Sequence, residues 1–553
     1  MRVINGQILK KLLISGANNL YNHYPEIDAL NVFPVPDGDT GINMNLTLSS
    51  GSEEIFNRND EDIYSIAKTF SRGLLIGARG NSGVITSQIF RGISDSLKDK
   101  TEANAIDLAY AFDNGRKVAY KAVIKPVEGT ILTVIRESSS MLLDKVNEKT
   151  TIEEALYILY KEAERSLDRT PNLLPVLKEV GVVDSGGAGL VRIIEGIYSA
   201  ACGEFINKND VSVVNEKNSE NNELDDVVYN YSLEFVLKIG PENTKKTFQK
   251  NRFISILNSH CEDVKFEEIQ PKVISVKCNT SKIGSVISYC QNYGEFSKIE
   301  INPLSKKDEE KVEEIIEIVD DVDNHEEINE PLKEKAIIAV SVGEGINSYF
   351  KELGADYIVS GGQSMNPSTE DFIKAIKQCN AKNVYILPNN SNIILAATQA
   401  KDVLSDDYNI EVIPTKTITQ GLLACMSYTQ GLDNKLNLDN MMEAITSIKS
   451  GSVTFSIKDT DINGIHINKN EFIAIRESKK IIKACLNKVE ALFALLDEMI
   501  DGLSSIVTLL IGQDVSGEEE VNLRNKLKEK YGYLDFEIRR GEQPIYSFYV
   551  GVE

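Results

Sequence analysis

The sequence predicts a multidomain protein: an all-helical N-terminal domain, a small α+β middle domain and a two-lobed α/β region at the C-terminus. Three observations predict this division. Apolar residues recur at helical spacing early in the chain, β-branched runs alternate with helical stretches late in the chain, and two polar segments lie between. With 553 residues and 42% hydrophobic composition, the chain can bury several cores.

The helical domain is placed at residues 1–203. Residues 103–124 and 151–167 show amphipathic patterns rich in Ala, Leu and Lys, and β-branched runs are scarce around them. A segment rich in Asn, Glu and Asp follows at residues 204–226. Because it lacks aliphatic periodicity, this segment is predicted to be a solvated linker.

The middle domain is placed at residues 227–305. Its predicted strands lie at residues 232–240, 272–280 and 296–301, where β-branched residues alternate or cluster. A second polar segment follows at residues 306–335, with 13 acidic residues against five lysines. Its centre could form one short helix, but a charged tether is the favoured interpretation.

The C-terminal α/β region is placed at residues 336–553. Its first lobe has β-branched runs that end in Gly, Asn or Pro and alternate with helical stretches. The runs lie at residues 335–343, 355–362, 383–390 and 409–415. This pattern predicts parallel strands, whose carboxyl ends usually meet ligands or partners. From about Met441 the pattern indicates a second α/β lobe.

Polar side chains gather at the predicted strand ends of the first lobe. They are Gln363, Ser364, Asn389, Asn390, Thr415 and Lys416. Gly, Asn and Pro commonly end strands, which explains each string separately but not the collection of polar groups. We therefore expect a partner-docking surface on the C-terminal region.

The charge balance excludes two classes of partner. Against 60 Lys and Arg stand 83 Asp and Glu, and the resulting formal charge of -23 repels nucleic acid and anionic membranes. We find no signal peptide and no stretch near the ~20 apolar residues that span a bilayer, so no integral membrane contact is expected. The seven cysteines form no CxxC pair, which predicts reduced thiols in a cytoplasmic protein.

The sharpest local motif is the Asp-Gly-Asp-Thr-Gly string at residues 37–41. Asp37 and Asp39 lie two residues apart on a Gly-containing turn, so both carboxylates can reach one hard cation. A helix can start near Thr40, and backbone N–H groups at a helix start bind phosphate. Magnesium with a nucleotide is the functional interpretation, although an ordinary turn before a capped helix has the same pattern.

Three more glycine-containing loops support a nucleotide site. At residues 74–92, Gly80 allows a ligand close to the backbone, and Asn81 or Ser82 can donate to phosphate oxygens. Neither of the two commonest nucleotide fingerprints, GxxxxGK[ST] or GxGxxG after a strand, is present. Tight helix packing at small residues is the alternative explanation.

The other two loops lie at residues 125–137 and 181–192. Thr130 and Asp184 are their polar groups best placed to meet a ligand. Each loop is a weak signal by itself. A plain helical bundle uses glycine mainly at helix caps, so four such loops in one domain favour a nucleotide site.

The order of these motifs is specific. NVFPVPDGDTGINM, GARGNSG, KPVEGT and DSGGAG, within residues 1–203, resemble the DhaL-type domain, the ATP-binding L-subunit of dihydroxyacetone kinases. The three-part layout, with VSGGQSMNPST, ILPNNSN and VIPTKTITQG near the C-terminus, is similar to the large ATP-binding subunit of bacterial fatty acid kinase. The resemblance covers nearly the whole chain.

This resemblance implies a barrel of antiparallel helices that binds Mg-ATP at one end. It implies that Asp37 and Asp39 are magnesium ligands, that Asn31 lies near a third ligand position, and that Thr40 joins the catalytic group. The residues implied to line the phosphates are Thr40, Asn43, Gly80, Asn81, Ser82 and Thr130. Those implied to close the nucleotide pocket are Asp184, Gly186 and Gly187.

The implied reaction transfers phosphate from ATP to a fatty acid carboxylate that a separate fatty-acid-binding protein presents. The product is an acyl phosphate used in phospholipid synthesis, and the family resemblance also implies a homodimer. Such a carboxylate, with a pKa near ~4–5, is already ionised at neutral pH and needs no general base. We therefore expect His23, His260, His325 and His466 to be structural or solvated.

Two alternatives remain open. One is a dihydroxyacetone-type kinase of another small substrate, which is disfavoured because no segment supplies a nucleophile-holding histidine in a substrate domain. The other is a nucleotide-binding regulatory protein without turnover.

The middle domain departs from the family pattern. The family has a Tyr-Cys-Thr-Glu-Phe string and a His-x-His-Thr string, which together resemble a metal site. Here Ser232 replaces the cysteine, and the second string has Cys278 but neither histidine. Cys278 alone cannot hold structural zinc, and the neighbours His260 and Cys261 are a weak ligand pair. We predict no zinc in this domain.

Overall fold

The structure is a computed structural model. It describes residues 1–32, 38–123, 125–209, 231–239, 250, 253, 257, 261–270, 272–280, 286–287, 290, 293–303, 333–362, 366–456, 459–462, 465–477 and 480–553. The chain divides into two compact units, one formed by Met1–Val211 with Pro331–Glu553 and the other by Ser212–Glu330. Five residues considered above lie outside the described residues: Asp37, His260, His325, Gln363 and Ser364.

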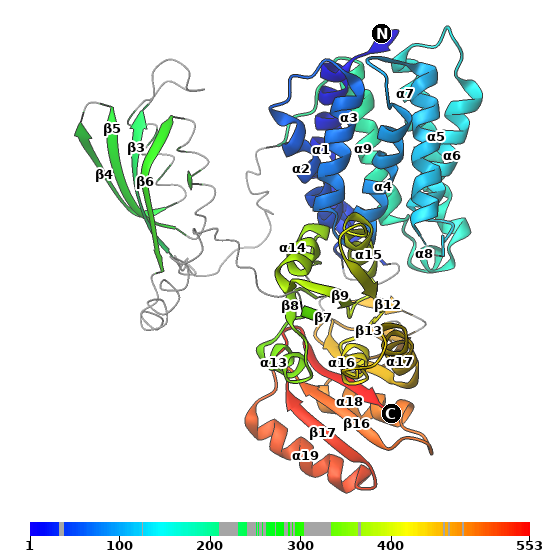
Figure 1. The fold of residues 1–553 in the computed structure, drawn as a ribbon, viewed down its shortest axis with the longest axis vertical. Coiled ribbons are helices and arrows are strands. Elements are labelled where there is room, and N and C mark those ends of the chain that lie inside the picture. The colour runs from blue at the N-terminus through cyan, green and yellow to red at the C-terminus, as the bar shows by residue number, and fades with distance from the viewer. Residues whose placement is uncertain are drawn as a thin grey trace. The chain divides into compact units, whose positions relative to one another are not determined.

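The N-terminal part of the first unit is a domain of helices, which confirms the predicted helical domain (Figure 1). The helices are α1 (Gly6–Ala29), α2 (Thr40–Phe56), α3 (Ile63–Gly77), α4 (Gly80–Ser96), α5 (Ala105–Ala122), α6 (Ile131–Lys145), α7 (Ile152–Leu173), α8 (Pro175–Val180) and α9 (Ser185–Ala201). From α1 to α7 each helix packs on the next, and α9 packs on both α7 and α1, so the ring of neighbours closes. Two short strands, β1 (Val3–Ile4) and β2 (Ala103–Asn104), pair beside it.

Local side-chain caps explain where the two clearest sequence-predicted helices begin. The Asn104 side chain accepts the Asp107 N–H at α5 while Asp107 accepts the Asn104 N–H. Thr151 and Glu154 form the same capping box at α7. The apolar faces of the helices share one core, and this burial contributes most of the stability of such helices.

The C-terminal part of the first unit begins with a parallel sheet in the order β10-β9-β7-β8. Its strands are β7 (Lys333–Ser341), β8 (Tyr357–Ser360), β9 (Ala381–Leu387) and β10 (Asn409–Val412). Alternate residues of β7 point to opposite faces. Ile338 packs with α14 (Thr369–Cys379) and α15 (Ile394–Val403). Ile337 packs with α13 (Glu344–Glu352), α16 (Ile418–Met426) and α17 (Asn434–Ser447).

A second, mixed sheet follows in the order β15-β14-β11-β18-β16-β17. Its strands are β11 (Lys449–Phe455), β14 (Phe472–Arg476), β15 (Lys480–Cys485), β16 (Ile506–Ile511), β17 (Asp535–Arg540) and β18 (Tyr546–Val552). Only β16 and β17 pair in parallel within it, and α18 (Lys488–Met499) and α19 (Gly517–Tyr531) pack on its core. Two short strands, β12 (Thr460–Ile462) and β13 (Ile465–Ile467), pair antiparallel. The predicted α/β C-terminal region is thus confirmed, with one parallel and one mixed sheet.

The second unit contains an antiparallel sheet in the order β4-β5-β3-β6. Its strands are β3 (Tyr231–Ile239), β4 (Glu262–Gln270), β5 (Val273–Thr280) and β6 (Gly294–Pro303). Three of them coincide with predicted strands, whereas β4 was not predicted. The α+β class of this unit stays a prediction.

No helix in the described part of the chain combines the length and apolar character that a membrane span requires. The seven cysteines are free thiols, and all except Cys202 are buried. Of the described histidines, His23 contacts the Asn19 carbonyl through Nδ1 at 2.8 Å, and His466 lies on β13.

Candidate functional site

Three helix starts meet around Thr40 at one end of the helical domain. Thr40 is the first residue of α2 and is buried. The Ser185 hydroxyl, at the start of α9, donates to Thr40 Oγ1 at 3.2 Å. The Ser82 hydroxyl, in the first turn of α4, donates to the Thr40 carbonyl at 3.4 Å. The N-termini of α2, α4 and α9 therefore lie together.

Asp184 adds the start of α6 to this group. Its carboxylate accepts the Gly187 N–H at 2.7 Å, which caps α9, and it also accepts the N–H of Ile131, the first residue of α6. Burial raises the pKa of Asp184 to about 6, although these two hydrogen bonds act to lower it. Four helix starts thus converge, and their partial positive charges favour a bound anion such as phosphate.

Two carboxylates lie at the start of α2. Asp39 occupies the N-cap position, but its side chain makes no capping hydrogen bond. Asp28, at the end of α1, caps instead: its Oδ1 accepts the Gly41 N–H at 2.6 Å and the Ile42 N–H at 3.1 Å. Burial raises the pKa of Asp28 to about 6, the two N–H groups oppose the rise, and the Asp39 charge adds to it.

Asp28 was missed by sequence reasoning. It lies in a helical stretch where an acidic residue normally faces solvent. Only the packing of α1 against α2 brings it to the Asp-Gly-Asp-Thr-Gly motif.

The loop before α4 approaches α2 closely. Gly80 has a φ of +59°, and a Cβ at this position would lie 2.7 Å from Asn43 Nδ2. The neighbouring Arg79 N–H donates to Thr47 Oγ1 at 3.3 Å, one turn further along α2. Asn43 and Gly80, which the sequence placed in separate motifs, are therefore direct neighbours.

The remaining predicted residues differ in their surroundings. Asn31 is buried and its N–H donates to the Asp28 carbonyl at 3.1 Å. The Thr130 hydroxyl donates to the Val127 carbonyl at 2.7 Å within its own loop. Gly186 lies beside the first residue of α6, because a Cβ there would be 3.4 Å from Ile131 Cβ.

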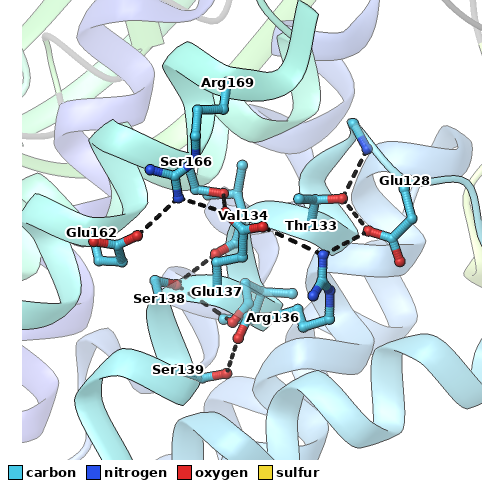
Figure 2. Close-up of polar contacts among 12 residues, drawn as sticks. Glu128, Thr133, Val134, Arg136, Glu137, Ser138, Ser139, Glu162, Ser166 and Arg169 are labelled. Carbon is cyan, nitrogen blue, oxygen red and sulfur yellow. Dashed lines mark hydrogen bonds and ion pairs between the residues drawn. The ribbon is translucent and has the colours of Figure 1, made fainter. Parts of the chain in front are cut away.

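Figure 2 shows a polar network that holds the loop before α6 and that the sequence did not predict. Glu128 accepts hydrogen bonds from Thr133 and, at 3.0 Å, from Arg136. Burial opposes ionisation of Glu128, but these contacts outweigh it and hold the pKa below its usual value. Glu137 extends the network to α7, where Arg169 donates to it at 2.6 Å.

The same end of the helical domain contacts the parallel-sheet lobe through α14 and α15 (Figure 1). Arg79 Nη1 donates to the Asn366 carbonyl at 3.0 Å, and Asn81 Nδ2 donates to Asn392 Oδ1 at 3.0 Å. Asn366 and Asn392 follow β8 and β9 respectively. The carboxyl ends of these parallel strands therefore lie against the start of α4.

Several of the polar residues expected to form a docking surface have internal roles instead. Asn389 is buried with a φ of +58°; its N–H donates to Thr415 Oγ1 at 2.9 Å and its Nδ2 to the Val340 carbonyl at 2.8 Å. Asn390 is also buried, and its Oδ1 accepts the Asn392 N–H at 2.9 Å. Of the described members of this set, only Lys416 is exposed. Strand-end turns thus account for part of this collection, whereas Asn389 Oδ1 and Asn390 Nδ2 are buried without a hydrogen-bond partner among the described residues.

Comparison with known proteins identifies the family. A DAK2 domain model matches residues 34–199, and a FakA-like C-terminal domain model, named for fatty acid kinase, matches residues 336–553. Protein YloV of Bacillus subtilis is 41% identical, with 100% of both chains covered. An uncharacterized protein of Staphylococcus saprophyticus is 40% identical, covering 100% of this chain and 99% of its own. The chain belongs to the FakA-like fatty acid kinase family.

Two solved structures give weaker likenesses for this family member. A DegV lipid-binding protein from Thermotoga maritima matches with a TM-score of 0.31 and 14% identity, covering 40% of this chain and 98% of its own. The fatty acid kinase B3 protein of Streptococcus pneumoniae, loaded with linoleic acid, matches with a TM-score of 0.28 and 16% identity. The match covers 40% of this chain and 99% of the B3 protein.

The side chains at the start of α2 fit a hard cation. Within the described ranges, no group of three or more His, Cys, Asp or Glu side chains is placed to hold a metal. The described carboxylates there are those of Asp39 and of Asp28, and Oδ1 of Asp28 already accepts two N–H groups of α2. Magnesium commonly takes only one or two protein carboxylates and completes its shell with water and phosphate oxygens. A magnesium site of this kind does not require that all the metal ligands come from the protein.

The middle unit, whose sequence departs from the family pattern, contains three buried cysteines. Cys261, Cys278 and Cys290 share one buried core. A hydrogen bond with Cys261 and burial raise the pKa of Cys278, and burial raises that of Cys290 to about 12. The same hydrogen bond lowers the pKa of Cys261, so the pKa values of the three thiols do not shift in one direction. The absence of zinc stays a prediction.

Proposed function

We propose that this chain is the ATP-dependent kinase subunit that phosphorylates a fatty acid carboxylate presented by a separate fatty-acid-binding protein. The product is an acyl phosphate. The observation that carries the proposal is the convergence of four helix starts with Asp39 at one end of the DAK2 domain. Such an end favours phosphate groups and a cation that accompanies them. Membership in a kinase family supports ATP as the phosphate donor.

In this proposal the site residues take the roles that the family resemblance implied. Asp37 and Asp39 hold magnesium, with Asn31 beside them, and the metal neutralises phosphate charge. The phosphates lie along Thr40, Asn43, Gly80, Asn81, Ser82 and Thr130. Asp184, Gly186 and Gly187 close the pocket, and the buried Asp184 keeps the starts of α6 and α9 in place for this.

Phosphoryl transfer to a carboxylate mainly requires that the protein align the two substrates and neutralise the charge of the phosphates. A carboxylate oxygen attacks the terminal phosphorus, the bond to the ADP oxygen breaks, and no proton has to be removed from the nucleophile. The helix-start N–H groups that Asp28 and Asp184 do not accept, together with the Asn43 amide, can hold the phosphates without covalent chemistry. The acceptor arrives on a partner, which is consistent with a chain that belongs to the FakA-like family.

The test is ADP release from Mg-ATP by the full-length chain, with and without the fatty-acid-binding protein loaded with oleate. Asp39→Ala and the double variant Asp37→Ala with Asp39→Ala should abolish release. Asp144→Ala is the matched control, because Asp144 is an exposed carboxylate near the opposite end of α6. We expect turnover only with the loaded partner, and only in the wild type and in the control.

The two alternatives give different results in this assay. Tight Mg-ATP binding without turnover in the presence of loaded partner would instead indicate a nucleotide-binding regulatory protein. Turnover with dihydroxyacetone in the absence of the partner would indicate a kinase of another small substrate. Either result would contradict the proposed function.

A further inference from the structure

Asn366 lies in the parallel-sheet lobe but contacts the metal-binding end of the helical domain. Its side chain is only 3% exposed. Asn366 Nδ2 donates to Asp39 Oδ2, and its backbone carbonyl accepts Arg79 Nη1 at 3.0 Å. One residue of the α/β lobe therefore contacts both the Asp-Gly-Asp-Thr-Gly motif and the loop before α4.

The amide oxygen of Asn366 has no hydrogen-bond partner among the residues that the structure describes. A buried acceptor without a partner is unfavourable by roughly 1–3 kcal/mol, so proteins rarely keep one without a reason. If the amide were reversed, its oxygen would face the Asp39 carboxylate. A carboxylate only accepts hydrogen bonds, so the two oxygens could not form one. The free oxygen is thus available to a ligand that brings a donor.

The position of Asn366 is set by the segment that follows it. Ser368 and Asp371 form a capping box at the start of α14. The Thr369 N–H donates to the Ala78 carbonyl at 3.1 Å, and Ser368 forms a β-bridge with Arg79. Asn366 Nδ2 also lies 3.5 Å from where a Cβ would sit on Gly80, so the amide is adjacent to the phosphate-binding loop.

We propose that Asn366 is a positioning residue of the magnesium–nucleotide site, supplied to the helical domain by the α/β lobe. The inference rests on the function proposed above. The Asn366 amide N–H group holds the Asp39 carboxylate in place. The amide oxygen of Asn366 accepts a hydrogen bond from the bound ligand, such as a water on the metal. Outer-shell partners of metal-ligating carboxylates orient those ligands and raise metal affinity.

The test measures binding of a non-hydrolysable ATP analogue to the full-length chain during a magnesium titration. Asn366→Ala should raise the magnesium concentration for half-maximal binding by roughly 10–100-fold, the usual effect of losing such a partner. Binding of the analogue without magnesium should be unchanged. Asn366→Ser, which is too short to span to Asp39, is the second variant should the alanine variant fold poorly.

Two further variants separate the explanations. Gln399→Ala weakens the same contact between the lobe and the helical domain, but Gln399 does not touch Asp39, so its magnesium requirement should match wild type. Asp39→Ala should raise the requirement at least as much as Asn366→Ala.

Three results would overturn the inference. An unchanged requirement in the Asn366 variants, with a raised one in Asp39→Ala, would overturn the role of Asn366 alone. An equal rise in Gln399→Ala would assign the effect to the lobe contact in general. An unchanged requirement in Asp39→Ala would contradict the magnesium site, and the proposed function with it.

Discussion

Gly80 is a residue at which α4 approaches α2 closely. Its φ of +59° lies in the left-handed region, and an added Cβ would come within 2.7 Å of Asn43 Nδ2. Gly181 also has a positive φ, of +77°, but no heavy atom lies within 4 Å of its added Cβ. Substitutions at Gly80 and Gly181 therefore separate the effect of backbone conformation on stability from the effect of a close neighbour.

We expect Gly181→Ala to lower the free energy of unfolding by about 1 kcal/mol and to leave nucleotide affinity unchanged, because only backbone strain is added. Gly80→Ala should lower it further and weaken nucleotide binding at least about tenfold, because Asn43 must move. Denaturant unfolding and calorimetric titration measure both quantities. Equal effects of the two substitutions on nucleotide affinity would contradict the role of close approach.

Asp184 should make stability depend on pH. Its pKa is about 6 in the folded chain and 3.8 in its ordinary state, so between these values the unfolded chain releases the proton while the folded chain retains it. The wild type should therefore lose up to about 3 kcal/mol of stability as pH rises from 4 to above 6.

Asp184→Asn removes this titration. Its free energy of unfolding should rise relative to wild type across the same pH window and then level off, as measured by denaturant unfolding at several pH values. Asp144→Asn, an exposed carboxylate, is the control. A difference between Asp184→Asn and wild type that stays constant with pH would show that the folded-state pKa of Asp184 is ordinary.

At the scale of elements, the start of α2 depends on a cap from another helix. Asp28 on α1 accepts two N–H groups of α2, whereas Asp62 caps its own helix, α3, by accepting the Ser65 N–H at 2.7 Å. Asp62 lies beside the start of α1, at the opposite end of the domain from Asp28. Both residues are thus aspartate caps of a helix N-terminus, but only Asp28 lies at the candidate site.

Asp28→Ala and Asp62→Ala should each lower the free energy of unfolding by about 1 kcal/mol, the usual effect of losing an N-cap. Only Asp28→Ala should also weaken binding of Mg-ATP, because it frees the start of α2 that carries Asp39. Binding of a non-hydrolysable ATP analogue checks this difference. If Asp62→Ala weakened nucleotide binding as much, general destabilisation would explain both.

At the scale of the whole first unit, one buried glutamine joins the helical domain to the α/β lobe. Gln399 on α15 donates to the Leu75 carbonyl at 2.6 Å and accepts from Gln88 Nε2 at 2.9 Å. Ala78 and Val84 of the helical domain also belong to the core of the parallel sheet. These contacts couple the two parts directly.

Gln399→Ala should destabilise this contact by about 2 kcal/mol, because it leaves the Leu75 carbonyl and the Gln88 amide without partners. Hydrogen exchange of the full-length chain should quicken at the end of α3 and in α14 and α15. Gln513→Ala, an exposed glutamine, should change neither exchange nor stability. Unchanged exchange in Gln399→Ala would mean that Gln399 contributes little to holding the parts together.

The sequence by itself determined the helical N-terminal domain, the α/β character of the C-terminal region and the family. Each depends on short-range information: amphipathic spacing in α5 and α7, β-branched runs at β7 to β10, and contiguous motif strings. It also singled out Asp39 and, through the family resemblance, Asn43 in one motif and Gly80 in another.

Only the tertiary structure decided how those loops meet and what else joins them. Asp28 lies in no motif, and Asn366 lies in the VSGGQSMNPST string, far along the chain from Asp39. The packing of α1 on α2 and the contact of the lobe bring these two residues to the start of α2. Asn389 is a similar case, because its hydrogen bonds go to Thr415 and Val340, which follow or lie on other strands of the sheet. The physical reason is the same in each case: partners distant along the chain leave no local pattern, because only packing brings them together.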